Sequence, residues 1–545
     1  MTTATPGFAQ PIAPSKVHAK LAKGPGRIGM VAFAAFLTLG LVYAASQLVG
    51  DLSHVRTSSA FPFLFLGVAL LIALGFEFVN GFHDTANAVA TVIYTHTLDP
   101  HIAVVWSGVW NFIGVLVSTG GVAFGIISLL PVELILQVGG GAGFAMVFAL
   151  LAAAILWNLG TWWLGLPSSS SHTLIGSIIG VGLANQMMHK ASATSGVDWG
   201  QAGSVGKSLL ISPIVGFVCA GLLLLVMKAI VPNKRLYEAP ANDEPPPFWI
   251  RCLLVLTCTG VSFAHGSNDG QKGMGLIMLI LIGIVPGAFA LKMGTDSASI
   301  AALAAQAQKV TAAVEQSANG TTLSKEDADA ELKGFLKGKN PKSDKTFAAI
   351  SAETAAISAA LDGKTSFNDL SVDDRRTVRG ETYLAAETIG KLDKGKKLED
   401  IPAKQDLTGF KKQSDKITKY IPDWVKIAVA LALGFGTMIG WKRIVVTVGE
   451  KIGKEHLTYA QGASAEIVTW AAIQAADNFG LPVSTTHILS SGIAGTMAAN
   501  GSGLQAQTLR NIVLAWVLTL PVCIFLGAVL FASGLFIVFN VFGLK

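Results

Sequence analysis

Two short polar clusters lie inside apolar stretches of this chain, and each cluster occurs twice. Residues 80–88 read NGFHDTANA and have a counterpart at 265–273, which reads HGSNDGQKG. Residues 165–172 read GLPSSSSH and have a counterpart at 480–487, which reads GLPVSTTH. An aspartate in a membrane span costs ~2.5–3.5 kcal/mol on insertion scales, so it persists mainly where it binds something or faces water. Two copies of such groups predict two related halves that enclose one polar site.

The composition places most of the chain in lipid. Hydrophobic residues make up 51% of the 545 residues and charged residues only 14%, whereas a soluble domain carries about 25% charged residues. The apolar runs are long enough to cross a hydrocarbon core of about 30 Å, and they predict an all-α, multi-pass membrane protein with about 10–12 spans. The net charge of +6 comes with Lys and Arg beside these runs, which favours retention in the membrane over nucleic-acid binding.

Changes in composition divide the chain into six parts. The basic N-terminus and the long apolar run after it favour an uncleaved first helix over a signal peptide. A stretch rich in Ala, Lys, Asp and Glu cannot lie in lipid, and its helical periodicity predicts an extramembrane helical insert that serves as a spacer or regulatory module. The parts are the tail and extra helix (1–60), the first membrane repeat (61–231), a cytoplasmic linker (232–247), the start of the second repeat (248–295), the insert (296–421) and the remainder of the second repeat (422–545).

Two basic clusters, in the linker and at residues 442–454, mark loops on the cytoplasmic side. Apolar runs at 248–266 and 274–292 read as two spans before the insert, and a run at 423–441 reads as one span after it. With three spans between them, the two basic clusters would lie on opposite sides of the membrane. One segment of the second half is therefore expected to be re-entrant or half a span, and the side of the insert is left open.

The Pro-Ser/Thr clusters are typical of helix starts. Hydroxyl side chains favour the N-cap and first turn, where backbone N–H groups and the helix dipole are free to meet an anion. Two such starts facing each other would form a donor-rich pocket for an oxyanion. The alternative is a pair of ordinary capped helices at loops.

The aspartate clusters meet the opposite requirement. Asp84 and Asp269 offer hard oxygen ligands suited to a small cation or a proton. A multivalent anion cannot enter a site of low dielectric constant unaccompanied, so a cotransported cation would offset its charge and supply the driving force. The alternative is that each aspartate caps a broken helix.

Other polar residues of the clusters have two interpretations each. Lys272 stands where the first copy has Asn87, so it either replaces a transported cation or contacts the anion, or else it pairs with Asp269. The histidines His83, His172, His265 and His487 titrate near neutral pH and could couple protons, although a histidine after a helix cap often bonds to the backbone.

The clusters together resemble the inorganic phosphate transporter (PiT) family, and within it the bacterial low-affinity Pit type of phosphate symporter. The likeness covers most of residues 61–540, including the position of a polar insert. It implies two inverted-topology repeats with broken or re-entrant helices, and phosphate bound between them. The resemblance also implies a multi-pass protein of the bacterial inner membrane that carries phosphate, as a neutral complex with divalent metal ions, together with protons. Animal relatives that use sodium carry a glutamate where this chain has Asn111, which weakens the case for sodium.

The resemblance and the chemistry together give a set of candidate site residues. No cofactor and no resident metal site is expected, and a homo-oligomer is left open. The residues expected to bind phosphate are Ser169, Ser170, Ser171, Ser484, Thr485, Thr486, Asn87, Asn268, Gln271 and Lys272, and those expected to couple cations or protons are Asp84, Asp269, His83, His172 and His487.

Three other functions are kept as alternatives. The chain could carry another oxyanion such as sulfate or arsenate, or it could couple phosphate to sodium. It could also be a membrane receptor or scaffold whose insert binds a partner. An enzyme is not expected, because the sequence contains no pairing of a nucleophile with a base and no closed set of metal ligands.

Overall fold

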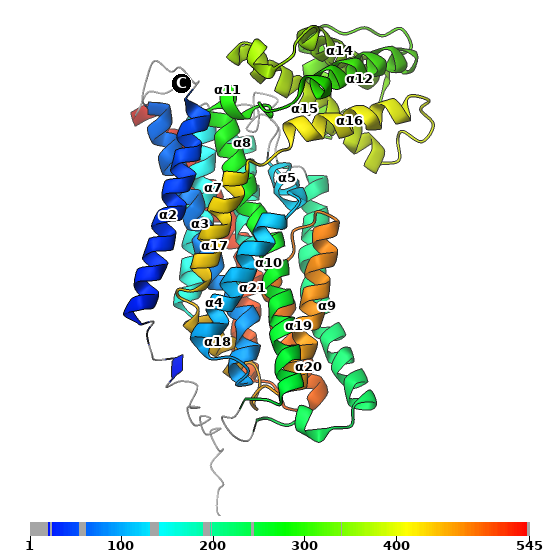
Figure 1. Ribbon diagram of the computed structural model, residues 1–545. Helices are drawn as coiled ribbons and strands as arrows, with labels where there is room; N and C mark the ends of the chain where they lie inside the picture. The colour runs from blue at the N-terminus through cyan, green and yellow to red at the C-terminus, as the bar shows by residue number, and fades with distance from the viewer. Residues whose placement is uncertain are drawn as a thin grey trace, which may run out of the picture.

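The computed structural model describes residues 20–21, 24, 26–53, 61–130, 141–188, 197, 199–240, 245–338 and 340–541, and the side chains of residues 61, 62, 85–87 and 141 lie outside this description. The described part is helical and contains no β-strand. Long, nearly parallel helices form a bundle, and a smaller group of helices lies at one end of it (Figure 1).

The first half of the bundle follows an outer helix, α2, which packs against α17 of the second half. Phe33 of α2 meets Phe435 of α17 edge to face, with ring centroids 4.8 Å apart. The helices of this part are α2 (Arg27–Leu52), α3 (Phe61–Tyr94), α4 (Pro100–Val117), α5 (Gly121–Ile127), α7 (Gly141–Trp163), α8 (Ser170–Met188) and α9 (Trp199–Ile230).

The second half has a corresponding order of helices, interrupted by the insert. One very long helix and one short helix precede the insert, and the others follow it. They are α10 (Phe248–Ile284), the short α11 (Pro286–Phe289), α17 (Asp423–Thr437), α18 (Lys442–Glu450), α19 (Tyr459–Asn478), α20 (Thr485–Asn500) and α21 (Ala506–Phe536).

Seven of the described helices are long and apolar enough to cross a membrane, or up to eight if α17 and α18, which meet at a bend of 62°, form one broken span. The sequence-based number of about 10–12 also counted shorter segments. Helices α8, α19 and α20 are such segments: they are largely buried in the bundle and carry many small and polar side chains. A helix enclosed by protein has no need of a uniformly apolar surface.

The two aspartate clusters do not interrupt their helices. Asp84 lies within α3 and Asp269 within α10, and both helices continue through the cluster. The prediction of two spans at 248–266 and 274–292 is therefore wrong, because residues 248–284 form the single helix α10. The polar residues of this segment are buried against other helices, so the drop in hydropathy marks a site and not a break.

Helix packing in the bundle comes in matched pairs. Helix α9 packs on α20 and α21 packs on α8, while α4 packs on α10 and α17 packs on α3. Glycines allow the last two contacts to be close: a Cβ atom on Gly114 would collide with the carbonyl of Phe263, and one on Gly81 would collide with the carbonyl of Leu433. These pairs support two related halves, and the inverted orientation of the halves stays a prediction.

The insert forms a helical body with a hydrophobic core of its own, at one end of the bundle. Its two connections to the bundle meet in a neck, where the backbone N–H of Lys292 donates to the carbonyl of Ile417 at 3.0 Å. Its helices are α12 (Ser297–Glu315), α13 (Lys325–Leu336), α14 (Asp344–Leu361), α15 (Val372–Lys394) and α16 (Lys404–Thr418).

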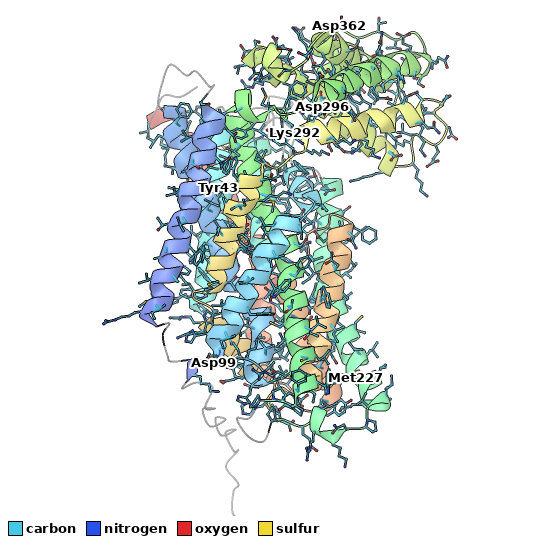
Figure 2. All side chains as sticks on the ribbon, viewed as in Figure 1. Tyr43, Asp99, Met227, Lys292, Asp296 and Asp362 are labelled. Atoms are coloured by element: carbon cyan, nitrogen blue, oxygen red, sulfur yellow. The ribbon has the colours of Figure 1, made fainter. Side chains whose placement is uncertain are left out.

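The continuous α10 also places the insert relative to the basic loops. Figure 2 shows Asp362 of the insert at one end of the molecule, and Met227, just before the linker, at the other. Helix α18, with the second basic cluster, lies at the same end as Met227. Because α10 leads away from the linker and α17 leads back, both basic clusters fall on one side. By the positive-inside rule we expect that side to be cytoplasmic and the insert to face the opposite compartment.

This arrangement predicts which residues a membrane-impermeant thiol reagent reaches from outside. In a background with Cys219→Ser and Cys252→Ser, which removes the exposed cysteines, Asp362→Cys should be labelled in intact cells with a permeabilised outer membrane. The linker variant Glu238→Cys, also at an exposed position, should be labelled only after lysis. The reverse pattern would show that the insert is cytoplasmic.

Candidate functional site

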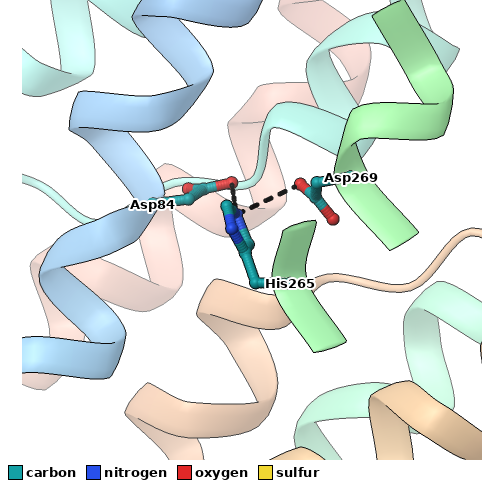
Figure 3. Close-up of side chains that lie close together, drawn as sticks. All are labelled: Asp84, His265 and Asp269. Atoms are coloured by element: carbon teal, nitrogen blue, oxygen red, sulfur yellow. Dashed lines mark ion pairs between the residues drawn. The ribbon is translucent and has the colours of Figure 1, made fainter. Parts of the chain in front are cut away.

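Two buried aspartates face each other across the bundle, with a histidine between them. His265 Nε2 lies 3.9 Å from Asp84 Oδ2 and 3.6 Å from Asp269 Oδ2 (Figure 3). All three side chains are almost fully buried. The first half supplies Asp84 from α3, and the second half supplies Asp269 and His265 from α10, so the site lies between the halves.

Hydroxyls from both Pro-Ser/Thr clusters donate to these carboxylates. Ser170 Oγ lies 2.7 Å from Asp84 Oδ2 and 3.2 Å from Asp269 Oδ2. Thr486 Oγ1 donates to Asp84 Oδ1 at 2.7 Å. The four polar segments, which are far apart in sequence, thus meet at one point.

The first turns of α8 and α20 bring these hydroxyls to the site. Ser169 Oγ accepts the backbone N–H of His172 at 3.3 Å, and Ser484 Oγ accepts that of His487 at 3.1 Å. Both serines therefore act as helix caps, as expected for hydroxyls at a helix start. The capping leaves the hydroxyls in the first turn of each helix directed toward the carboxylates.

A tight turn precedes each of these helices. Gly165 and Gly480 adopt φ values of 68° and 64°, in the left-handed region that glycine occupies without steric cost. The two turns are tied together, because Ser171 Oγ donates to the carbonyl of Val483 at 2.7 Å. This bond links the start of α8 to the segment before α20.

Lys272 is fully buried and forms an ion pair with Asp269. Its Nζ lies 2.6 Å from Asp269 Oδ2 and 2.5 Å from Ser171 Oγ. Pairing does not exclude a part in substrate binding, since the same ammonium also reaches a hydroxyl of the α8 cluster. The cluster of two carboxylates and one ammonium has a net charge of −1 when the nearby histidines are neutral.

Two histidines are held by neighbouring polar groups. His83 bonds to Asp84 through Nδ1 and to Thr161 Oγ1 through Nε2, both at 3.2 Å. His265 Nδ1 lies 2.6 Å from Asn111 Oδ1. The amide oxygen can only accept, so Nδ1 of His265 carries the proton and Nε2, which faces the aspartates, can accept a proton from the site.

In this conformation, two residues expected to bind phosphate, Gln271 and Asn268, form hydrogen bonds to neighbouring segments. Gln271 Nε2 donates to Asp477 Oδ1 at 2.7 Å, and its Oε1 accepts the backbone N–H of Val122 in α5 at 2.9 Å. Asn268 Nδ2 donates to the carbonyl of Leu481 at 3.2 Å. In this conformation they fix the α5 segment and the turn before α20.

Among the remaining expected residues, those with described side chains form no hydrogen bond to the aspartates. The rings of His172 and His487 are tilted by 38° with centroids 4.5 Å apart, and His487 also lies against Trp516 at 4.1 Å. The hydroxyl of Thr485 has no hydrogen-bond partner among the described residues. The side chain of Asn87 lies outside the described part of the structure.

Sequence reasoning missed Asp477, a buried acid that accepts bonds from Gln271 and from Ser267 Oγ at 2.6 Å. It lies three residues before the GLP motif of the second half, where the first half has Trp162. The prediction depended on duplication, and this acid has no counterpart. The sequence did single out His265 and Asn111, without showing that they touch.

The donor set could hold a cation. One ligand atom each from Asp84, His265 and Asp269 can be chosen so that all three lie within 4.8 Å of one another. Carboxylate oxygens suit hard cations, and an added imidazole nitrogen suits a divalent transition metal. Because Lys272 already compensates Asp269, one further positive charge neutralises the cluster.

Fold and site together define a multi-pass membrane transporter with a polar site enclosed between two halves. Residues 80–527 match the phosphate transporter family, and the chain belongs to this family. This result confirms the predicted resemblance and the prediction that the chain is not an enzyme.

Bacterial relatives match over almost their whole length. The chain is 42% identical to the low-affinity inorganic phosphate transporter PitA of Escherichia coli strain K12 over 494 residues, covering 87% of this chain and 97% of that protein. It is 41% identical to PitB of the same strain over 507 residues, covering 86% and 97%. A solved structure titled "The sodium-dependent phosphate transporter" covers 86% of this chain and 98% of that one, but its TM-score of 0.47 and identity of 17% are too low to bear on mechanism.

The buried ion pair predicts coupled effects on stability. Asp269→Asn and Lys272→Met should each lower the melting temperature of the detergent-solubilised protein, because removing one partner of a buried pair costs ~3–5 kcal/mol. The double variant should recover most of that loss, since no uncompensated charge remains. Losses that simply add in the double variant would contradict this account of the pair.

Proposed function

We propose that this protein imports inorganic phosphate by symport with a cation, with alternating access to the site between Asp84 and Asp269. The observation that carries the proposal is the convergence of hydroxyl donors from α8 and α20 on two buried carboxylates. The names of the bacterial relatives support phosphate as the substrate. A bacterial inner membrane is the location that this function and these relatives favour.

The hydroxyls explain why transport would need a cation. Each hydroxyl has one proton to donate, and in the described conformation Ser170 and Thr486 donate theirs to Asp84. A phosphate at the N-termini of α8 and α20 would take over these donors. Asp84 would then be a buried carboxylate without its hydrogen bonds, next to an anion. A cation or proton on the carboxylate removes this penalty, so phosphate and cation would enter together.

The charge of the site sets how much positive charge must enter with phosphate. The cluster of Asp84, Asp269 and Lys272 lacks one positive charge, which a proton on the carboxylate or on His265 would supply. Phosphate entering as a neutral complex with a divalent metal would bring its own compensation. We favour proton coupling with a metal-phosphate substrate, and sodium coupling is the alternative.

Uptake of labelled phosphate into proteoliposomes tests the proposal, with the pH gradient, sodium and magnesium varied independently. Asp84→Asn should abolish uptake, and Ser170→Ala should lower it by at least about ten-fold, because a donor is lost at the substrate. Ser177→Ala is the matched control: Ser177 lies two turns further along α8 and donates only to the carbonyl of Leu174. Full uptake by Asp84→Asn would contradict the proposal.

The same assay separates the alternative substrates. Excess sulfate or arsenate that competes as strongly as unlabelled phosphate would show a general oxyanion carrier. A receptor or scaffold would show no uptake that depends on the two hydroxyl clusters.

The charge of Lys272 predicts how many cations accompany phosphate. If its ammonium stands in for a transported cation, Lys272→Asn should steepen the dependence of the uptake rate on cation concentration, because one more charge must be supplied. Initial rates over a range of pH, and in a second series of sodium concentrations, measure this. An unchanged dependence would show that Lys272 only pairs with Asp269.

A further inference from the structure

A cavity of about 390 Å³ lies outside the site described above, at the junction between the insert and the bundle. A smaller cavity of about 30 Å³ lies toward Leu279 and Ile282 of α10. The two share wall residues, so they lie next to each other at this junction. The shared wall residues are Ser128, Tyr383, Glu387 and Lys419.

The wall of the larger cavity is strongly basic. Lysines from α15, α16 and their surroundings line it, and Glu387 is the acid among the lining residues. Lys419 pairs with Glu387 at 2.5 Å, and both Lys419 and Lys411 pair with Asp415. Among the described residues, two acids lie beside five lysines, and a basic wall of this kind attracts anions. The five lysines are Lys337, Lys391, Lys394, Lys411 and Lys419.

A buried arginine lines the smaller cavity. Arg379 of α15 is 9% exposed, and its Nε has no hydrogen-bond partner among the described residues. Its described neighbours are aromatic: the guanidinium lies 5.8 Å from the ring of Tyr383. Burial lowers the pKa of Arg379. A buried guanidinium nitrogen without a partner among the described residues is costly unless an anion completes it, and the planar set of donors fits an oxyanion such as phosphate.

The larger cavity is linked to the transport site through α5. Gln201, in the cavity wall, donates to the carbonyl of Gly125 in α5 at 3.3 Å. The first turn of α5 is bonded to Gln271 of α10, and Gly121 lies against Gly480 in the turn before α20. Helix α5 therefore separates the larger cavity from the segment that carries Thr486.

We propose that this junction is a second phosphate site, in which Arg379 binds inorganic phosphate that the lysines attract from the compartment of the insert. The inference rests on the proposed function for the choice of phosphate, since the wall chemistry alone specifies an oxyanion. Its role is to raise the local concentration of substrate beside α5. A site of this kind affects the Michaelis constant of uptake more than the maximal rate.

Direct binding tests the site without transport. The full chain with Ser170→Ala and Thr486→Ala, which removes both hydroxyl donors from the transport site, is reconstituted in nanodiscs of phosphatidylcholine and titrated with labelled inorganic phosphate. Binding should persist, weaken with added salt, and weaken by at least about ten-fold on further substitution of Arg379→Gln. Binding that is indifferent to Arg379 would overturn the proposal. So would phosphate that is displaced by phosphatidylglycerol added to the discs, because the site would then hold a lipid headgroup.

Uptake kinetics give the second test. In proteoliposomes at low salt, Arg379→Gln and the exposed rim variant Lys394→Gln should each raise the Michaelis constant for phosphate several-fold with little change in maximal rate. Lys309→Gln, an exposed lysine of the insert outside the cavity, is the control. If Arg379→Gln fails to fold, the Michaelis constant of Lys394→Gln alone tests the proposal. An unchanged Michaelis constant in a wild type that transports would overturn this inference, whereas absence of uptake in the wild type would contradict the proposed function and leave the binding test to decide.

Discussion

One hydroxyl proton between two buried carboxylates organises the centre of this protein. Ser170 lies within hydrogen-bonding distance of both Asp84 and Asp269, and it can donate to only one of them at a time. Burying two acids at the crossing of α3 and α10 is costly in free energy, and nearby donors offset that cost. The glycine contacts that let the helices approach, the caps of α8 and α20, and Lys272 all maintain this arrangement.

Duplication made much of the site predictable from the sequence. Hydroxyls and acids that recur in the same order in two apolar halves indicate that the four segments meet, and Asp84, Asp269, Ser170 and Thr486 do meet. Residues with no counterpart in the other half gave no such signal, which is why Asp477 was missed. Partners within the site were also unpredictable, because Gln271 and Asn268 carry the right chemistry yet bind neighbouring segments.

The fold class could be predicted, but helix continuity could not. Low hydropathy at 265–273 suggested a break, because lipid would reject those residues. In the structure other protein segments surround them: Gly266 lies against the backbone of Asn111, and Gly270 lies against Val115. A sequence records how polar a residue is and not what covers it. The error in α10 carried over into the crossing count and left the side of the insert undecided.

The neck of the insert has a mechanical consequence. Helices α10 and α17 lead into and out of the insert, and the bond between Lys292 and Ile417 clamps the two connections together. The ends of α10 and α17 nearest the insert cannot spread apart without breaking this clamp, so the pair behaves as a hairpin hinged at the neck. While the clamp holds, an opening at the insert end of the bundle must form by displacement of other helices. Helices α10 and α17 can then separate only at the end of the bundle far from the insert.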